Sequence, residues 1–182
     1  MVVIIILAVV AVIVLWYIST YNSLVKLRNK AQTAWAQVDV VLKRRADLIP
    51  NLVETVKGYA KHEKETLQAV IAARNNYTNA STVEEQIETS NQLTQAIGRL
   101  FAVAEAYPDL KANENFIQLQ NELTETENKI QYARQFYNDD VNQYKNKLEM
   151  FPSSLVASFG HFEKLPFFEV EASAKEAPHV QF

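Results

Sequence analysis

The chain has 182 residues, of which 48% are hydrophobic and 21% charged, so collagen-like, low-complexity and fully disordered proteins are excluded. It contains no cysteine, which excludes disulfides, thiolate zinc sites and cysteine nucleophiles. The net charge of −3, from 18 basic and 21 acidic residues, gives no overall positive field, and we therefore expect no nucleic-acid partner.

The first predicted element is a membrane anchor over residues 1–20. Residues 2–18 contain no charge, glycine or proline, and as a helix they would measure about 26 Å, close to the thickness of about 30 Å of a hydrocarbon core. A cleaved signal peptide is the alternative, but the basic start is missing and the stretch ends in Trp16-Tyr17-Ile18 instead of small residues. We therefore expect a single transmembrane helix.

The residues around the exit of this helix predict its depth and orientation. Trp16, Tyr17 and Tyr21 are amphipathic rings of the kind that lie at the membrane interface. The basic residues Lys26, Arg28 and Lys30 follow within the window that sets topology, whereas the other end offers only the amino terminus. This charge bias predicts that the soluble part faces the cytoplasm.

The anchor is expected to continue without interruption into the soluble part, because no glycine or proline occurs before Pro50. Apolar residues then recur at alternating steps of three and four, which predicts a helix packed against partners; they are Leu24, Leu27, Ala31, Ala34, Val38 and Val41. Pro50 disfavours helical geometry in the preceding residue, so we expect a boundary or kink here, with Pro50 in the first turn of the next helix.

Three further helices follow in the prediction. The second runs from Pro50 to Asn79, the third begins at a capping box of Ser81 with Glu84 and stops at Tyr107-Pro108-Asp109, and the fourth covers about 113–150. Since short connections favour antiparallel neighbours, we expect an all-α fold with an antiparallel up-down four-helix bundle over 21–151. An extended coiled coil with partners in trans is the alternative, which the large residues Trp35, Phe101 and Phe116 disfavour.

The segment 152–182 is expected to form a short helix and an extended tail. The apolar run from Ser153 to Phe159 is stopped by Gly160, which predicts one or two helical turns. Four apolar residues of the tail are expected to pack on the bundle or on a neighbouring subunit; they are Phe162, Phe167, Phe168 and Val170.

The sequence contains no pattern typical of a catalytic, cofactor or metal site. His62, His161 and His179 are scattered, and although His62-Glu63 begins like a zinc-protease helix, Thr66 stands where the second histidine is needed. One polar cluster stands out at the predicted corner, formed by Arg44, Arg45, Asp47 and Pro50. It is either an arginine–carboxylate link between helix ends or a docking point for a partner.

Several segments in the same order resemble the LemA family. They include Tyr17, the stretch Tyr21-Asn22-Ser23-Leu24-Val25, the ten residues RRADLIPNLV at 44–53, Tyr107-Pro108-Asp109, and Phe151-Pro152-Ser153. The resemblance covers essentially the whole chain. It implies a single-pass bacterial inner-membrane protein with a helical bundle, with no assigned enzymatic activity, whose relatives are linked to membrane metalloproteases of the HtpX type and to magnetosome membrane organisation.

Two functional hypotheses follow. The first is a non-catalytic scaffold, fixed to the bilayer by one span, that forms a homo-oligomer and presents an interaction surface to membrane partners. The second is an adaptor or modulator of a membrane metalloprotease of the HtpX type. A hydrolase or transferase would need a cleft with perturbed ionisable groups, and the sequence predicts none.

Overall fold

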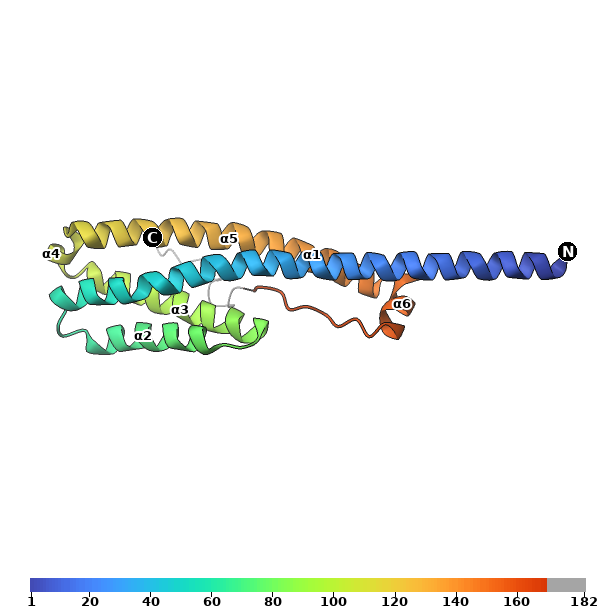
Figure 1. Cartoon of the computed structure of the whole chain (residues 1–182). Coiled ribbons are helices and arrows are strands. Elements are labelled where there is room, and N and C mark those ends of the chain that lie inside the picture. Colours follow the sequence, from blue (N-terminus) through green and yellow to red (C-terminus); the bar gives the residue numbers. More distant parts are fainter. Residues whose placement is uncertain (170–182) are drawn as a thin grey trace, which may run out of the picture. The chain divides into compact units, whose positions relative to one another are not determined.

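The computed structural model describes residues 1–169, so the predictions for Val170 and His179 lie outside the described residues. In this part of the chain the structure is all-helical, without strands, as the sequence predicts (Figure 1). The helices are α1 (Val2–Tyr59), α2 (Lys64–Asn79), α3 (Val83–Ala104), α4 (Pro108–Lys111), α5 (Glu114–Glu149) and α6 (Ser153–Phe159). The described part divides into two compact units, and both α1 and α5 contribute to each.

The first unit consists of Met1–Gln37 and Ala133–Phe167, that is, the first part of α1, the second part of α5, and α6. The large apolar residues of α1 up to Ile18 are exposed, whereas Thr20 is already buried. Beyond this point α1, α5 and α6 share a buried cluster of Leu24, Tyr144, Leu148, Val156 and Ala157. The prediction of an apolar helix that continues without a break into the folded part is confirmed.

The second unit consists of residues 38–132 together with residues 168 and 169. Its core draws on the second part of α1, on α2, α3 and α4, and on the first part of α5. In this unit α2 and α3 lie side by side (Figure 1). The stripe of α1 that faces the core includes Val38, Leu42, Ile49, Leu52 and Val56, which are all almost fully buried.

The predicted helix boundary at Pro50 is wrong, because α1 runs through Pro50 and ends at Tyr59. An interior proline costs about 3 kcal/mol. After Pro50, however, Leu52, Val53 and Val56 are buried, and each such side chain stabilises by about 1.5–3 kcal/mol when fully buried. Burial therefore outweighs the defect. The turn lies instead between Tyr59 and Lys64, and the helix predicted from Pro50 to Asn79 begins at Lys64.

Two other boundaries differ from the predictions. The N-cap of α3 is Thr82 paired with Glu85, one residue after the predicted pair of Ser81 and Glu84, since both pairs fit the same sequence pattern. The Tyr107-Pro108-Asp109 stop opens a short helix, α4, with Pro108 in its first turn. The predicted short helix after Pro152 is confirmed as α6, with Gly160 as its C-cap.

Candidate functional site

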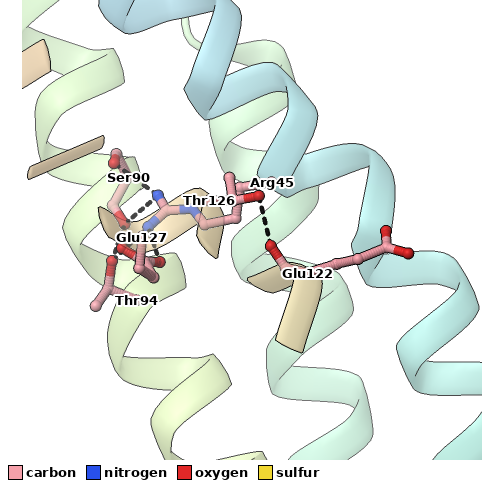
Figure 2. Close-up of polar contacts among 6 residues, drawn as sticks. All are labelled: Arg45, Ser90, Thr94, Glu122, Thr126 and Glu127. Carbon is pink, nitrogen blue, oxygen red and sulfur yellow. Dashed lines mark hydrogen bonds and ion pairs between the residues drawn. The ribbon is translucent and has the colours of Figure 1, made fainter. Parts of the chain in front are cut away.

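The main polar site is the Arg45 cluster, which we define as Arg45, Ser90, Thr94, Thr126 and Glu127 (Figure 2). Arg45 is only 1% exposed. Because an arginine is rarely buried without partners, hydrogen-bond acceptors are expected around it. Its Nη1 donates to Thr94 Oγ1 and to Glu127 Oε1, each over 2.7 Å. Its Nη2 donates to the carbonyl oxygen of Ser90 over 3.0 Å and to Ser90 Oγ over 2.7 Å. One guanidinium thus links α1, α3 and α5.

The local sequence explains why this cation lies in the core. Arg45 falls between Leu42 and Ile49 on the buried stripe of α1, so its side chain enters the interior with them. The helices opposite place hydroxyls at buried positions, namely Ser90 and Thr126. Thr126 donates back to the carbonyl of Glu122 over 2.7 Å within α5 (Figure 2). The Thr126 hydroxyl is therefore satisfied as a donor within its own helix, whereas Ser90 Oγ accepts from Arg45.

The Arg45 cluster pairs a buried cation, Arg45, with a partly hydrated carboxylate, Glu127. The side chain of Glu127 is 38% exposed, whereas that of Arg45 is 1% exposed. Charge-assisted hydrogen bonds of this kind are shorter and stronger than neutral ones. One donor, Arg45 Nε, is buried without a partner, and such a group costs about 1–3 kcal/mol. The arrangement holds three helices in register and leaves no reactive group in the cluster.

A second polar contact joins α1 to α2. The hydroxyl of Tyr77, which is buried, donates to Asp39 Oδ1 over 3.3 Å. Burial, and next the negative charge of Asp39, raise the pKa of Tyr77 well above its usual range. Lys43 also donates to Asp39, through Oδ2 over 2.6 Å. The Tyr77 hydroxyl therefore stays neutral and serves as a hydrogen-bond donor.

The structure separates the residues of the predicted corner. Arg45 is buried, whereas Arg44, Asp47 and Pro50 are exposed. The hydrogen bonds of Arg45 go to residues far along the chain, and its carboxylate partner is Glu127 of α5. None of these partners lies near Arg45 in the sequence. A signal was present, because Ser90 and Thr126 occupy buried positions of their helices, where apolar residues are expected.

The three predicted membrane-interface residues lie on exposed positions of α1. Trp16 and Tyr17 lie at the end of the apolar stretch and Tyr21 lies three residues after it, and the helix is long and apolar enough to cross a membrane. The ring of Tyr21 makes an edge-to-face contact with Phe162, with 5.2 Å between the ring centroids. The aromatic residues at the exit thus include one that also packs against the segment after α6.

Two surface grooves of opposite charge lie in the second unit. The basic groove, about 720 Å³, runs between the end of α1 and the start of α2 and is lined by Val53, Glu54, Lys57, Lys61, His62, Lys64, Leu67, Gln68 and Ile71. The acidic groove, about 380 Å³, follows α5 and is lined by Glu114, Ile117, Gln118, Asn121, Glu122 and Glu125. Among residues 1–169, no group of three or more histidines and carboxylates is arranged to hold a metal ion.

Comparison with known proteins supplies the family. The sequence model of the LemA family matches residues 34–182. Protein LemA of Metamycoplasma hominis is 27% identical over 142 residues, which cover 78% of this chain and 65% of that protein. Magnetosome protein MamQ 2 of Paramagnetospirillum magneticum is 24% identical, with 88% of this chain and 68% of that protein covered. The chain thus spans about two thirds of the length of these relatives. The resemblance seen in the sequence is confirmed, and the chain belongs to the LemA family.

Proposed function

We propose that this chain is a membrane-anchored, non-catalytic scaffold that self-associates and presents an interaction surface at the bacterial inner membrane. Its domains are an anchor over 1–20, an antiparallel up-down four-helix bundle over 21–151 in the cytoplasm, and a tail over 152–182 packed on the bundle or on a neighbouring subunit. The observation that carries the proposal is α1 itself. One uninterrupted helix, Val2–Tyr59, contains both the exposed apolar stretch and a stripe that is buried in the folded part.

The use of the charged groups supports a non-catalytic role. Among the described residues, the carboxyls with a shifted pKa are Glu85, Glu125 and Glu149, and each shift is downward. The first cause is the backbone N–H of Ser81 for Glu85, and a hydrogen bond from Lys129 or Lys164 for the other two. A general acid requires the opposite shift, which burial produces. The buried cation, Arg45, is engaged in packing.

The two grooves support self-association. The basic groove presents Lys57, Lys61 and Lys64 beside Leu67 and Ile71, so it offers both charge and apolar area. The acidic groove presents Glu122 and Glu125 beside Ile117, which is 43% exposed. Opposite charges flanking apolar residues on one unit are complementary between two copies. Because the two surfaces differ, the contact is heterologous and can continue from copy to copy.

Charge reversal tests this proposal. Lys61→Glu with Lys64→Glu, or Glu122→Lys with Glu125→Lys, should each reduce the mass of the particle measured by native mass spectrometry of the full chain in nanodiscs. Combining both reversals should restore it, because complementarity returns with the signs exchanged. Glu88→Lys, on an exposed position of α3 outside both grooves, is the matched control. A wild-type particle of one copy at low salt would refute self-association.

The relatives are consistent with a membrane scaffold, but their names add no partner or activity to the proposal. MamQ proteins are named as magnetosome proteins, and that description applies to them. The alternative role as an adaptor of a membrane metalloprotease depends on the family resemblance alone, and no contact in the described residues favours it. We therefore retain the scaffold as the proposed function.

A further inference from the structure

A group of large apolar side chains is exposed at the end of α5 and along α6. We define the apolar edge as Met150, Phe151, Leu155 and Phe159, whose exposed fractions are 62%, 81%, 51% and 77%. Leu155 and Phe159 are four residues apart on α6, so they lie on the same face of this helix. The buried face of α6, with Val156 and Ala157, packs in the cluster that contains Leu24. Four exposed large apolar side chains between residues 150 and 159 indicate an interaction site.

The contacts within the first unit locate this edge along α1. Trp35 contacts Tyr137, with 5.1 Å between the ring centroids, and Lys30 pairs with Asp140 over 2.7 Å. Leu24 then shares a cluster with Tyr144 and Leu148. As the residue numbers rise on α5, the paired numbers fall on α1. Residues 150 and 151 of the apolar edge therefore lie beside the part of α1 that directly follows the apolar stretch.

Contacts of the segment after α6 place the apolar edge at the same position along the axis of α1. The ring of Phe162 contacts that of Tyr21, and the guanidinium of Arg28 lies 5.3 Å from the centroid of the Phe162 ring. Thr20 is only 7% exposed, although Ile18 is 49% exposed. The folded part thus begins to cover α1 within two residues of the end of the apolar stretch. No linker separates the apolar edge from the segment that would cross the membrane.

The dimensions of a bilayer then decide what the edge contacts. Leu24 lies six residues after Ile18, which is about 9 Å along an upright helix and less along a tilted one. The headgroup layer on each side of the hydrocarbon core is about 5–8 Å thick. Residues 150 and 151 come after Leu148, which packs beside Leu24. Measured along the axis of α1, they therefore lie nearer to Ile18 than Leu24 does. Phenylalanine, leucine and methionine side chains at this depth reach the boundary between headgroups and acyl chains.

We propose that the apolar edge inserts into the headgroup layer of the bilayer that α1 crosses, as a second membrane contact of this chain. The inference rests on the proposed membrane anchoring of α1. The occupant is lipid, because the edge lies at the level along α1 where the exposed apolar stretch ends in the aromatic residues Trp16 and Tyr17. A single span alone would leave the protein free to tilt about its exit, whereas a lateral apolar contact restricts that tilt.

Depth-dependent quenching tests this inference on the full chain, which contains no cysteine and can therefore be labelled at one introduced site. Leu155→Cys or Phe159→Cys would carry an environment-sensitive fluorophore in phosphatidylcholine and phosphatidylglycerol vesicles with nitroxide lipids. We expect quenching by a shallow nitroxide at both sites. Phe136→Cys is the matched control, because Phe136 is 66% exposed on α5 and lies about 21 Å before Met150 along the helix. It should be quenched several times less.

A fourth probe separates this inference from the anchoring itself. Ile13→Cys lies inside the apolar stretch and should be quenched by a deep nitroxide. Quenching at residue 13 without quenching at residues 155 and 159 would overturn the second contact and leave the anchor in place. No quenching at residue 13 would overturn both. A probe at residue 155 that is shielded from water but unquenched by nitroxide lipids would also overturn the inference, because protein then covers the edge.

A second measurement uses the same surface without a label. Phe151→Ser with Phe159→Ser removes two exposed rings, so internal packing should be unaffected. In nanodiscs the backbone amides of residues 150–160 should then exchange hydrogen faster than in the wild type, whereas Phe136→Ser should leave them unchanged. Equal exchange in the double variant and the wild type would contradict insertion of the edge.

Discussion

Arg45 Nη1 of α1 lies 2.7 Å from Glu127 Oε1 of α5, and the two side chains differ in exposure, at 1% and 38%. The cation is thus removed from water while its counter-ion stays partly hydrated. Taking a charge out of water is costly, and its compensation comes from four hydrogen bonds to Ser90, Thr94 and Glu127. We therefore expect the stability of the folded part to depend more on Arg45 than on Glu127.

The first prediction concerns truncation of this buried arginine. Arg45→Ala should destabilise the folded part by about 3–5 kcal/mol, because it leaves a cavity and strips partners from Ser90 and Thr94. The measurement is urea unfolding of the full chain in detergent micelles, followed by circular dichroism. Arg44→Ala, at the exposed neighbouring position, should change stability by less than about 0.5 kcal/mol. Equal effects of the two variants would show that the Arg45 cluster is not structural.

The second prediction concerns the segment after α6, which two tyrosines of α5 hold. Tyr137 donates to the carbonyl of Pro166 over 2.7 Å, and Tyr144 donates to the carbonyl of Glu163 over 3.0 Å. Each Tyr→Phe change should cost about 1 kcal/mol, the net value of a typical hydrogen bond. The double variant should show faster hydrogen exchange in residues 162–168. Tyr132→Phe, at a residue that is 66% exposed, is the control and should leave exchange unchanged.

The fold was predictable to the extent that it follows from local patterns. The absence of charge and helix breakers over 2–18 predicted the apolar helix, and the spacing of Leu24, Ala31 and Val38 predicted its buried stripe. The end of α1 was not predictable in this way, because Pro50 is a strong local signal. The side chains that overrule it, such as Leu52 and Val56, do so through contacts with α2, α3 and α5 that a local pattern does not contain.

The polar site was predictable only in part, for a related reason. Arg45 stands out in the sequence beside Arg44 and Asp47, but Glu127 lies 82 positions along the chain from it, and no local spacing connects the two. The hydroxyls at Ser90 and Thr126 were the available clue, since these two residues interrupt the buried apolar faces of two different helices. Matching such interruptions between helices requires their mutual register, which the sequence alone does not supply.

The third prediction concerns the effect of low pH on the N-terminal cap of α3. Glu85 accepts hydrogen bonds from the N–H groups of Ser81 and Thr82 and from the Ser81 hydroxyl, and these bonds lower the pKa of its carboxyl. A carboxyl whose pKa is lower in the folded than in the unfolded state stabilises above its unfolded pKa, and this contribution is lost as the pH falls through the folded pKa. The amides at the start of α3 should therefore lose protection as the pH drops below about 4.3.

Hydrogen exchange across this pH range measures the effect, with Glu85→Gln as the comparison. The amide retains an acceptor but does not titrate, so the start of α3 should lose its acid dependence in this variant. Glu84→Gln removes an adjacent carboxylate that makes no part of the capping box, and it should retain the wild-type dependence. If Glu84→Gln and Glu85→Gln behaved alike, the cap would not be the source of the pH response.

The last prediction returns to the proline inside α1. Pro50 lacks the N–H that would donate to the carbonyl of Ala46, and its ring crowds that carbonyl, while its own side chain is exposed. Pro50→Ala should therefore raise the free energy of unfolding by about 1–3 kcal/mol, since it restores the donor without disturbing the core. Pro108→Ala is the matched control, because a proline in the first helical turn costs nothing there. Thermal unfolding of both variants in micelles decides the matter: a loss of stability in Pro50→Ala would mean that this proline sets a local geometry that the folded part requires.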